Sequence, residues 1–455
     1  MAQYFQQFSI TDKVYSRVLL AFTLAVLASL QQSIASQPLS PNEQLGKSIF
    51  FDTHLSINQN QSCAGCHDPS AGWTGPSNDI NVTGSVYEGS IPGRFGNRKP
   101  PSSAYATPSP ILHFVIEKVN NKNKSEALFI GGNFWDGRAT GEKLGNPAAD
   151  QAQGPFLNPV EQALANSACV VYRVCNPVLP SDYPVSFEDV WGPGACAISW
   201  PLDVEAQCAT EGGSVTLSEA DRGKSDMAYD QIALSVASFE GSSESNAFTS
   251  KYDYYLAGLV DLSKQEKKGM NLFRSKGKCA NCHTMDPGPN GEPPLFTDYT
   301  FDNLGIPRNP ENPFYAQTDF NPQGQSWVDL GLGGFLDSRL DYQQYSAANQ
   351  GKQKVPTLRN VDKRPDPGFV KAYGHNGYFK SLKGIVHFYN TRDVKPACAD
   401  PFTSEADAVA MHCWPAPEVA NNVNTTELGD LKLTDAQEDA IVAFMKTLSD
   451  GYELP

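Results

Sequence analysis

Two pentapeptides of one pattern constrain this chain more than any other feature. Cys63-Ala64-Gly65-Cys66-His67 and Cys279-Ala280-Asn281-Cys282-His283 are both C-x-x-C-H, the attachment signal for c-type haem. The thiols add to the haem vinyl groups, and the adjacent histidine becomes the proximal iron ligand. Zinc sites and redox dithiols also use C-x-x-C pairs, but neither explains a histidine after both. The sequence therefore predicts two covalently bound c-type haems, with His67 and His283 as iron ligands.

The other six cysteines are predicted to form disulfides, because their number is even and the chain carries an export signal, described next. Six cysteines allow 15 connectivities. We take the local pairing as the working expectation: 169–175, 196–208 and 398–413. Such bonds would fasten long loop-rich insertions.

The N-terminus is typical of a secretory signal peptide. Lys13 and Arg17 precede an apolar run at residues 18–30, and small and polar residues follow it. A membrane anchor is the alternative, but a span needs about 20 apolar residues. We therefore predict a signal peptide at residues 1–36, cleaved near Ala35 or Ser36. The mature protein is expected to be periplasmic and not membrane-spanning.

Charge and composition narrow the class of protein. The chain has 50 acidic and 35 basic residues, a formal net charge of −15. This balance argues against nucleic-acid binding, which needs a basic face. Hydrophobic residues make up 40% of the chain, enough for real cores, while 37 Gly and 33 Pro indicate many loops.

The pattern along the chain predicts a mainly α fold of two cytochrome-c-like haem domains with long irregular loops. A short helix at residues 43–52 precedes the first haem motif, and one at 264–274 precedes the second. Further helices are expected at 217–240 and, after a capping box at Thr434, through Leu448. Loops are expected at 68–110, 155–215 and 284–325, and no sustained strand alternation is visible. The halves resemble an internal duplication, with an N-terminal domain at 37–250 and a C-terminal domain at 251–455.

Five further motifs, in order, resemble those of bacterial di-haem cytochrome c peroxidases and their MauG relatives. They are residues 134–139 (FWDGRA), 151–161 (QAQGPFLNPVE), 355–360 (VPTLRN), 373–377 (YGHNG) and 386–390 (VHFYN). The resemblance spans residues 40–450.

The resemblance implies roles for individual residues. The N-terminal haem would react with hydrogen peroxide, and the C-terminal haem would transfer electrons. Gln151, Pro155 and Glu161 match the distal pocket of the N-terminal haem, and Trp135 matches the tryptophan between the haems. A carboxylate facing an open haem can move a proton from the near to the far oxygen of peroxide. Without the resemblance, Trp135 could be core packing and Glu161 a solvated acid.

Two departures point towards the MauG branch. The peroxidases place a methionine ligand of the C-terminal haem 14 residues after the histidine of the YxHxG segment. Counting from His375, this position is Tyr389, as in MauG. Tyr373, His375 and Met411 are the alternative ligands. A switchable distal histidine is expected near position 83, which is Thr83 here, so the N-terminal haem is expected to have an open site without prior reduction.

Three functional hypotheses follow. The first is a peroxidase that reduces hydrogen peroxide with electrons from a small cytochrome or cupredoxin. The second is a MauG-like enzyme that uses peroxide to oxidise Trp or Tyr side chains of a partner protein. The third is a non-enzymatic di-haem electron carrier, in which both irons are six-coordinate. The resemblance also implies a Ca²⁺ ion between the domains, with Asn97 as a weak side-chain candidate.

Overall fold

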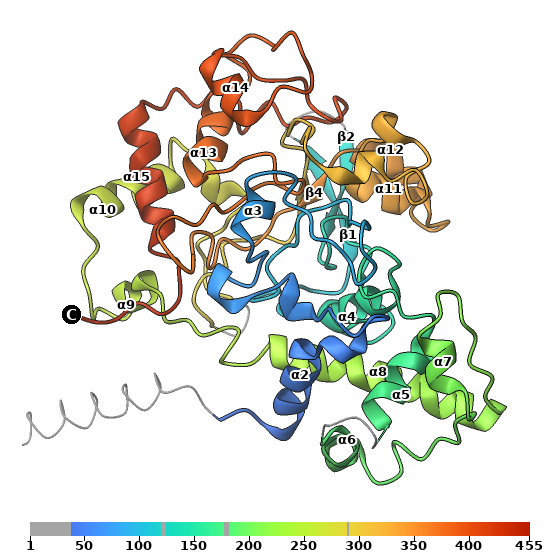
Figure 1. Ribbon diagram of the computed structural model, residues 1–455. Helices are drawn as coiled ribbons and strands as arrows, with labels where there is room; N and C mark the ends of the chain where they lie inside the picture. Colours follow the sequence, from blue (N-terminus) through green and yellow to red (C-terminus); the bar gives the residue numbers. More distant parts are fainter. Residues whose placement is uncertain (1–37, 120–123, 177–181, 289–290) are drawn as a thin grey trace, which may run out of the picture. The chain divides into compact units, whose positions relative to one another are not determined.

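The computed structural model describes residues 38–119, 124–176, 182–288 and 291–455 (Figure 1). The predicted signal peptide at 1–36 lies outside the described residues. Leu39–Pro455 forms one compact unit. The boundary between residues 250 and 251 therefore stays a prediction.

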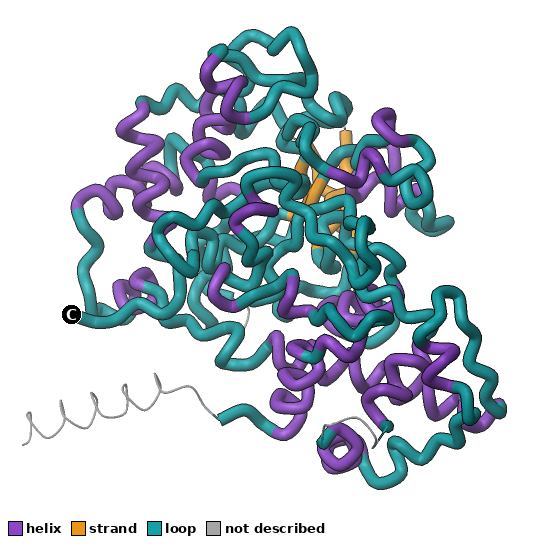
Figure 2. The backbone as a smooth tube through the Cα atoms, viewed as in Figure 1, coloured by secondary structure: helices purple, strands orange, loops and turns teal. Residues whose placement is uncertain are grey.

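Helices are the main regular secondary structure, sheet is scarce and loops make up much of the chain, as the sequence predicts (Figure 2). The helices are α2 Pro41–Phe51, α3 Asn78–Asn81, α4 Pro147–Leu157, α5 Ser167–Cys175, α6 Tyr183–Trp191, α7 Val204–Cys208, α8 Glu219–Glu240, α9 Lys251–Leu256, α10 Lys264–Arg274, α11 Gly331–Asp337, α12 Ser346–Asn349, α13 Leu382–Thr391, α14 Glu405–Ala410 and α15 Asp435–Lys446. The strands are β1 His113–Val119, β2 Lys124–Ile130, β3 Phe301–Asp302 and β4 Gln353–Lys354, paired antiparallel as β1–β2 and β3–β4.

The four helices expected from the sequence are present as α2, α8, α10 and α15. Their starts are capped as the residue types suggest. Ser40 and Ser263 form capping boxes with Glu43 and Glu266, and the amide of Thr434 donates to the side chain of Gln437. These caps satisfy amide groups that a helix start leaves unpaired.

The β1–β2 hairpin was not predicted. Its strands pair in register from His113 opposite Ile130 onwards. Phe114 and Phe129 on this hairpin pack against Tyr342 and Tyr345. Ile116 is largely exposed. The apolar residues therefore do not alternate cleanly, and the pairing depends on contacts distant in sequence.

The same helix crossing occurs twice. Helix α2 packs on α8, and α10 packs on α15 (Figure 1). Each crossing has a glycine at its closest point. A Cβ atom on Gly46 would lie 1.8 Å from the Ser235 carbonyl oxygen, and one on Gly269 would lie 1.8 Å from that of Ala440. Only glycine permits this approach.

Beside each crossing stands a cluster of three aromatic rings. Phe50, Trp73 and Phe239 lie edge to face with centroids 5.4–5.8 Å apart. Their counterparts Phe273, Phe296 and Phe444 have centroids 5.4–6.2 Å apart. Each cluster belongs to its own buried core, the first drawn from residues 45–239 with Leu295 and the second from residues 252–448. The two clusters thus repeat one packing scheme.

The segment at 155–215 contains helices α5, α6 and α7, and is not the irregular loop that we expected. Asn166 caps α5 through its side chain. In α6 the proline at position 184 reads as a loop signal, but it occupies the first turn, where its missing amide costs no hydrogen bond.

Two of the three expected disulfide pairings are wrong. The bonds are Cys169–Cys208, Cys175–Cys196 and Cys398–Cys413. Only the last is local as predicted. Cys169 and Cys175 lie six positions apart on α5, so each bonds to a different segment outside that helix.

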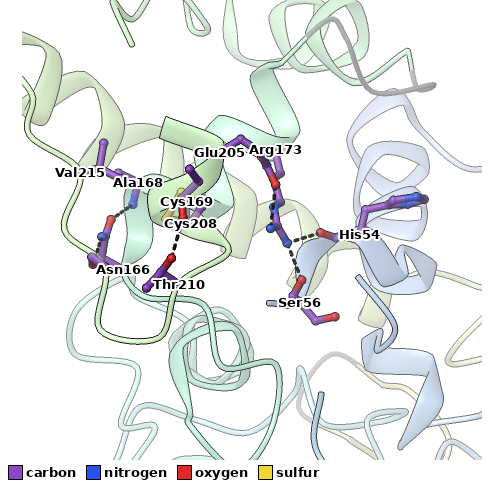
Figure 3. The surroundings of a disulfide bond; sticks show 12 residues. His54, Ser56, Asn166, Ala168, Cys169, Arg173, Glu205, Cys208, Thr210 and Val215 are labelled. Carbon is purple, nitrogen blue, oxygen red and sulfur yellow. Dashed lines mark hydrogen bonds and ion pairs between the residues drawn. A yellow bond between two sulfur atoms is a disulfide. The ribbon is translucent and has the colours of Figure 1, made fainter. Parts of the chain in front are cut away.

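Arg173 links this disulfide-bonded segment to the approach to the first haem motif. Its side chain is 1% exposed. The guanidinium donates to the carbonyl oxygens of His54 and Ser56 and pairs with Glu205 (Figure 3). Through these contacts α5 supports residues 54–56, which lead into Cys63.

Within the described residues, no helix has both the length and the hydrophobicity that a membrane span requires.

Candidate functional site

Each C-x-x-C-H motif borders its own cavity. The first cavity has a volume of about 70 Å³, and its walls include His67, Trp135 and Gln151. The second has a volume of about 200 Å³, and its walls include Cys279, Cys282, His283, Tyr389 and Trp135. The second cavity is lined by both cysteines and the histidine of its motif, whereas the first is lined by His67 but not by Cys63 or Cys66.

The two motif histidines are held alike. Nδ1 of His67 lies 3.3 Å from the carbonyl oxygen of Trp73, and Nδ1 of His283 lies 2.8 Å from that of Phe296. Trp73 and Phe296 both have positive φ, which turns the carbonyl towards the ring. Burial lowers the pKa of His67 to about 4 and also lowers that of His283. Burial therefore favours the neutral form of both rings, which is the form that binds iron.

Covalent haem attachment needs free thiols in both motifs, and the structure leaves the motif cysteines unpaired. The six outside the motifs form disulfides, whereas Cys63, Cys66, Cys279 and Cys282 are free thiols. Burial raises the pKa of Cys66 and of Cys279 to about 12, so these thiols are neutral. The free thiols, the oriented histidines and the adjoining cavities fit a c-type haem at each motif.

The predicted distal residues are arranged around α4. Gln151 lines the first cavity, and its side-chain amide has no hydrogen-bond partner among the described residues. Pro155, one helical turn later, and Glu161 are half-buried and outside the cavity lining. Oε1 of Glu161 accepts a hydrogen bond of 2.8 Å from the side chain of Asn158. Burial raises the pKa of Glu161, opposed by the charge of Arg138.

Trp135 lines both cavities, which no other predicted site residue does. Its side chain is 8% exposed. The indole Nε1 donates to the carbonyl oxygen of Lys99 at 2.8 Å. The ring faces that of His375 edge to face, with centroids 6.5 Å apart.

Among the candidate second-haem ligands, the structure sets Tyr389 and His375 apart from Tyr373 and Met411, since both ring nitrogens of His375 also lack a hydrogen-bond partner among the described residues. Tyr389, Tyr373 and His375 all line the second cavity, whereas Met411 is exposed and outside it. The hydroxyl of Tyr373 lies near Asp362 and Arg364. The hydroxyl of Tyr389 has no hydrogen-bond partner in the described part of the chain, and burial raises its pKa.

A buried chain of ion pairs runs beside Trp135. Asp136 binds Arg98 and Arg138 at 2.6 and 2.8 Å. Arg98 also binds Asp329 through two hydrogen bonds of 2.6 Å. Nε2 of His375 lies 3.9 Å from Asp329 and 3.5 Å from Glu418. These charges hold the loops that carry Trp135 and His375 in place.

Sequence reasoning missed several buried charged groups on the cavity walls, among them Glu240 and Lys99. Glu240, the last residue of α8, lines the first cavity, and burial raises its pKa to about 8. Lys99 lines the second cavity and is 8% exposed. No local sequence pattern indicates either residue, because its burial and its place on a cavity wall are known only from the folded structure.

Thr83, at the position of the expected switch histidine, is exposed and does not line either cavity. Its hydroxyl donates to the carbonyls of Asp79 and Ile80.

The chain is similar to known proteins over most of its length. Residues 40–261 match the family described as "Di-haem cytochrome c peroxidase". The methylamine utilization protein MauG of Paracoccus denitrificans is 32% identical over 412 residues, covering 89% of this chain and 88% of its own. The cytochrome c551 peroxidase of Nitrosomonas europaea is 25% identical and covers 80% of this chain and 79% of its own.

Among solved structures, the diheme peroxidase BthA of Burkholderia thailandensis is similar, with a TM-score of 0.63 and 26% identity. The alignment covers 91% of this chain and 87% of that one. The chain therefore belongs to the di-haem cytochrome c peroxidase and MauG family of oxidoreductases.

Proposed function

We propose that this protein is an exported di-haem c-type peroxidase that reduces hydrogen peroxide to water with electrons from a small redox protein. The observation that carries the proposal is Trp135, which lines both cavities while each cavity borders its own C-x-x-C-H motif. Bound haems would supply an iron that reacts with peroxide at the first motif and an iron that stores electrons at the second.

Glu161 and Gln151 would handle the substrate at the first site. In the ionised form, Oε2 of Glu161 can take a proton from the near oxygen of peroxide and return it to the far oxygen. Asn158 occupies Oε1 and so fixes the orientation of the carboxylate. The free amide of Gln151 can hydrogen-bond to peroxide in the cavity.

Trp135 would provide the aromatic path for electrons between the two sites. The indole Nε1 of Trp135 donates to the carbonyl oxygen of Lys99, and the carbonyl oxygen of Trp135 accepts from the backbone amide of Lys354, so both ends of the residue are held. Electrons would come from a small cytochrome or cupredoxin. Since the chain carries a net charge of −15, a donor with a basic patch is favoured.

A MauG-like reaction, the oxidation of Trp or Tyr side chains of a partner protein with peroxide, is the second candidate. Tyr389 favours it, because its unpartnered hydroxyl lines the second cavity with His283. Thr83 in place of a switch histidine also favours it.

The periplasm is the proposed location, and the three disulfides support it, since such bonds persist in oxidising compartments. The two repeated cores support the proposal of two haem domains, divided near residue 250. A Ca²⁺ ion between them, with Asn97 as a candidate ligand, stays a prediction.

Electron paramagnetic resonance of the diferric holoprotein, before and after one equivalent of hydrogen peroxide, tests the proposal. Low-spin signals from both irons, in a protein that reacts with hydrogen peroxide only after one haem has been reduced, would identify a reductively activated peroxidase. One high-spin and one low-spin signal, both lost before any reduction, would favour the MauG-like reaction. A protein that stays inert even after half-reduction would be an electron carrier, and the proposal would be wrong.

A further inference from the structure

Lys99 is hydrogen-bonded both to Trp135 and to a residue in the second half of the chain. Its carbonyl oxygen accepts the indole Nε1–H of Trp135 at 2.8 Å. Its own amide donates to the carbonyl oxygen of His375 at 2.8 Å. The backbone of this single residue therefore binds the indole of Trp135 on one side and the backbone of His375 on the other.

The duplication supplies a counterpart, Lys354. The amide of Lys354 donates to the carbonyl oxygen of Trp135 at 2.7 Å. Trp135 and His375 themselves occupy equivalent places in two loops closed by matching bridges, Asn133–Ala139 and Tyr373–Phe379. Each lysine thus binds through its amide to the loop residue of the opposite half.

The two ammonium groups differ in what they bind. Nζ of Lys354 donates to Ser109 Oγ and to the carbonyl oxygens of Gly131 and Gly132, so its three protons have three acceptors. Nζ of Lys99 has one acceptor in the described chain, the carbonyl oxygen of Pro100 at 3.0 Å. No carboxylate of the described residues lies within 4.0 Å of it.

A buried ammonium without a counter-charge is costly, and proteins rarely retain one unpaired. Lys99 is only 8% exposed, and it lines the second cavity. Burial lowers its pKa to about 8, so an adjacent anion is needed to keep it fully charged. A second buried lysine near it, Lys371, differs in that its Nζ is held by three carbonyl oxygens, and burial lowers its pKa well below the usual value.

We propose that the Lys99 ammonium binds a propionate carboxylate of the haem attached at Cys279 and Cys282, and thereby positions Trp135 against that haem. The required anion has the chemistry of a carboxylate, and haem brings two. Lys99 is then a positioning residue, with its side chain on the cofactor and its carbonyl on the indole. The inference rests on haem occupancy of the second cavity and not on which reaction the enzyme performs.

The test uses the holoprotein and its potentials. Lys99→Met removes the charge at similar volume, Lys99→Arg retains it, and Lys268→Met changes an exposed lysine with no contacts among the described residues. An optical and paramagnetic redox titration resolves the two haems. Loss of a positive charge beside a haem favours the ferric form, so Lys99→Met should lower the potential of the second haem. We expect at least a tenfold shift in its ferric–ferrous equilibrium, about 59 mV for one electron.

Lys99→Arg should largely restore the wild-type potential, and Lys268→Met should leave it unchanged. Resonance Raman bending modes of the propionates provide a second readout, which Lys99→Met should shift for one haem.

If Lys99→Met does not incorporate haem, Lys99→Gln takes its place in both measurements. Unchanged potentials and propionate modes in the neutral variants would overturn the inference. A second outcome would also overturn it. If chelation of calcium shifts the potential of the second haem in the wild-type protein, and neutral variants at position 99 do not, then a divalent ion and not Lys99 balances the charge of the propionate. None of these outcomes depends on peroxide turnover.

Discussion

Gly46 lies so close to the backbone of Ser235 that a Cβ atom at position 46 would stand 1.8 Å from the Ser235 carbonyl oxygen. Gly46→Ala must therefore separate α2 from α8. The expected loss of folding stability is about 1–3 kcal/mol, as for other overpacked sites. Gly269→Ala should behave alike at the α10–α15 crossing. Urea unfolding followed by circular dichroism measures both.

The matched control is Gly223→Ala. Gly223 lies within α8, and its added Cβ would meet nothing within 4 Å. This substitution should stabilise the protein by about 0.5–1 kcal/mol, because alanine is the better helix former. Equal effects at positions 46 and 223 would contradict the role of the crossing glycine.

Trp135→Phe should slow electron transfer between the haems more than it alters the fold. Phenylalanine retains an aromatic ring but loses the bond from Nε1 to Lys99, worth about 1 kcal/mol. We expect the transfer rate to fall about tenfold, equivalent to about 1.4 kcal/mol in the barrier. Stopped-flow spectroscopy of the second haem after peroxide mixing measures the rate. Phe134→Leu, which changes the neighbouring cavity residue, is the control, and equal slowing in both variants would argue against a specific path through Trp135.

Glu161→Gln should reduce the rate of reaction with peroxide by about 10²–10⁴-fold, because the amide cannot take up a proton. Burial raises the pKa of Glu161. The active form is the carboxylate, so the wild-type rate should fall as pH decreases through this raised pKa, above the range of an exposed glutamate. The variant should lose that acidic limb. Glu453→Gln, at an exposed position near the C-terminus, should keep it. An unchanged limb in Glu161→Gln would assign the proton transfer to another group.

Much of the fold could be predicted because its signals are local. Ser263 with Glu266 marks the start of α10, and the apolar spacing marks its buried face. The cysteine pairing could not be predicted this way, since Cys169 and Cys175 lie on one helix and bond to partners 39 and 21 residues away. The three-dimensional arrangement of the segment, and not spacing, selects these partners.

The candidate site divides in the same way. His67 and His283 follow from their own pentapeptides, and Gln151 and Tyr389 from motifs of the family resemblance. No sequence motif indicates Lys99. It is notable only because its ammonium group is buried and has no carboxylate partner among the described residues. That property exists only after residues from both halves have come together.

Tyr389→Phe tests the identity of the sixth ligand of the second haem. If the phenol oxygen binds iron, its loss should change the spin state of that haem and raise its potential, because an anionic oxygen ligand favours the ferric form. Tyr373→Phe is the matched control, since its hydroxyl lies near Asp362 and Arg364 while its ring lines the same cavity. Electron paramagnetic resonance should therefore respond to the change at position 389 alone. A response to Tyr373→Phe instead, or a low-spin signal typical of two histidine ligands that persists in Tyr389→Phe, would move the ligand to Tyr373 or His375. The MauG-like reaction would then lose the residue that favours it.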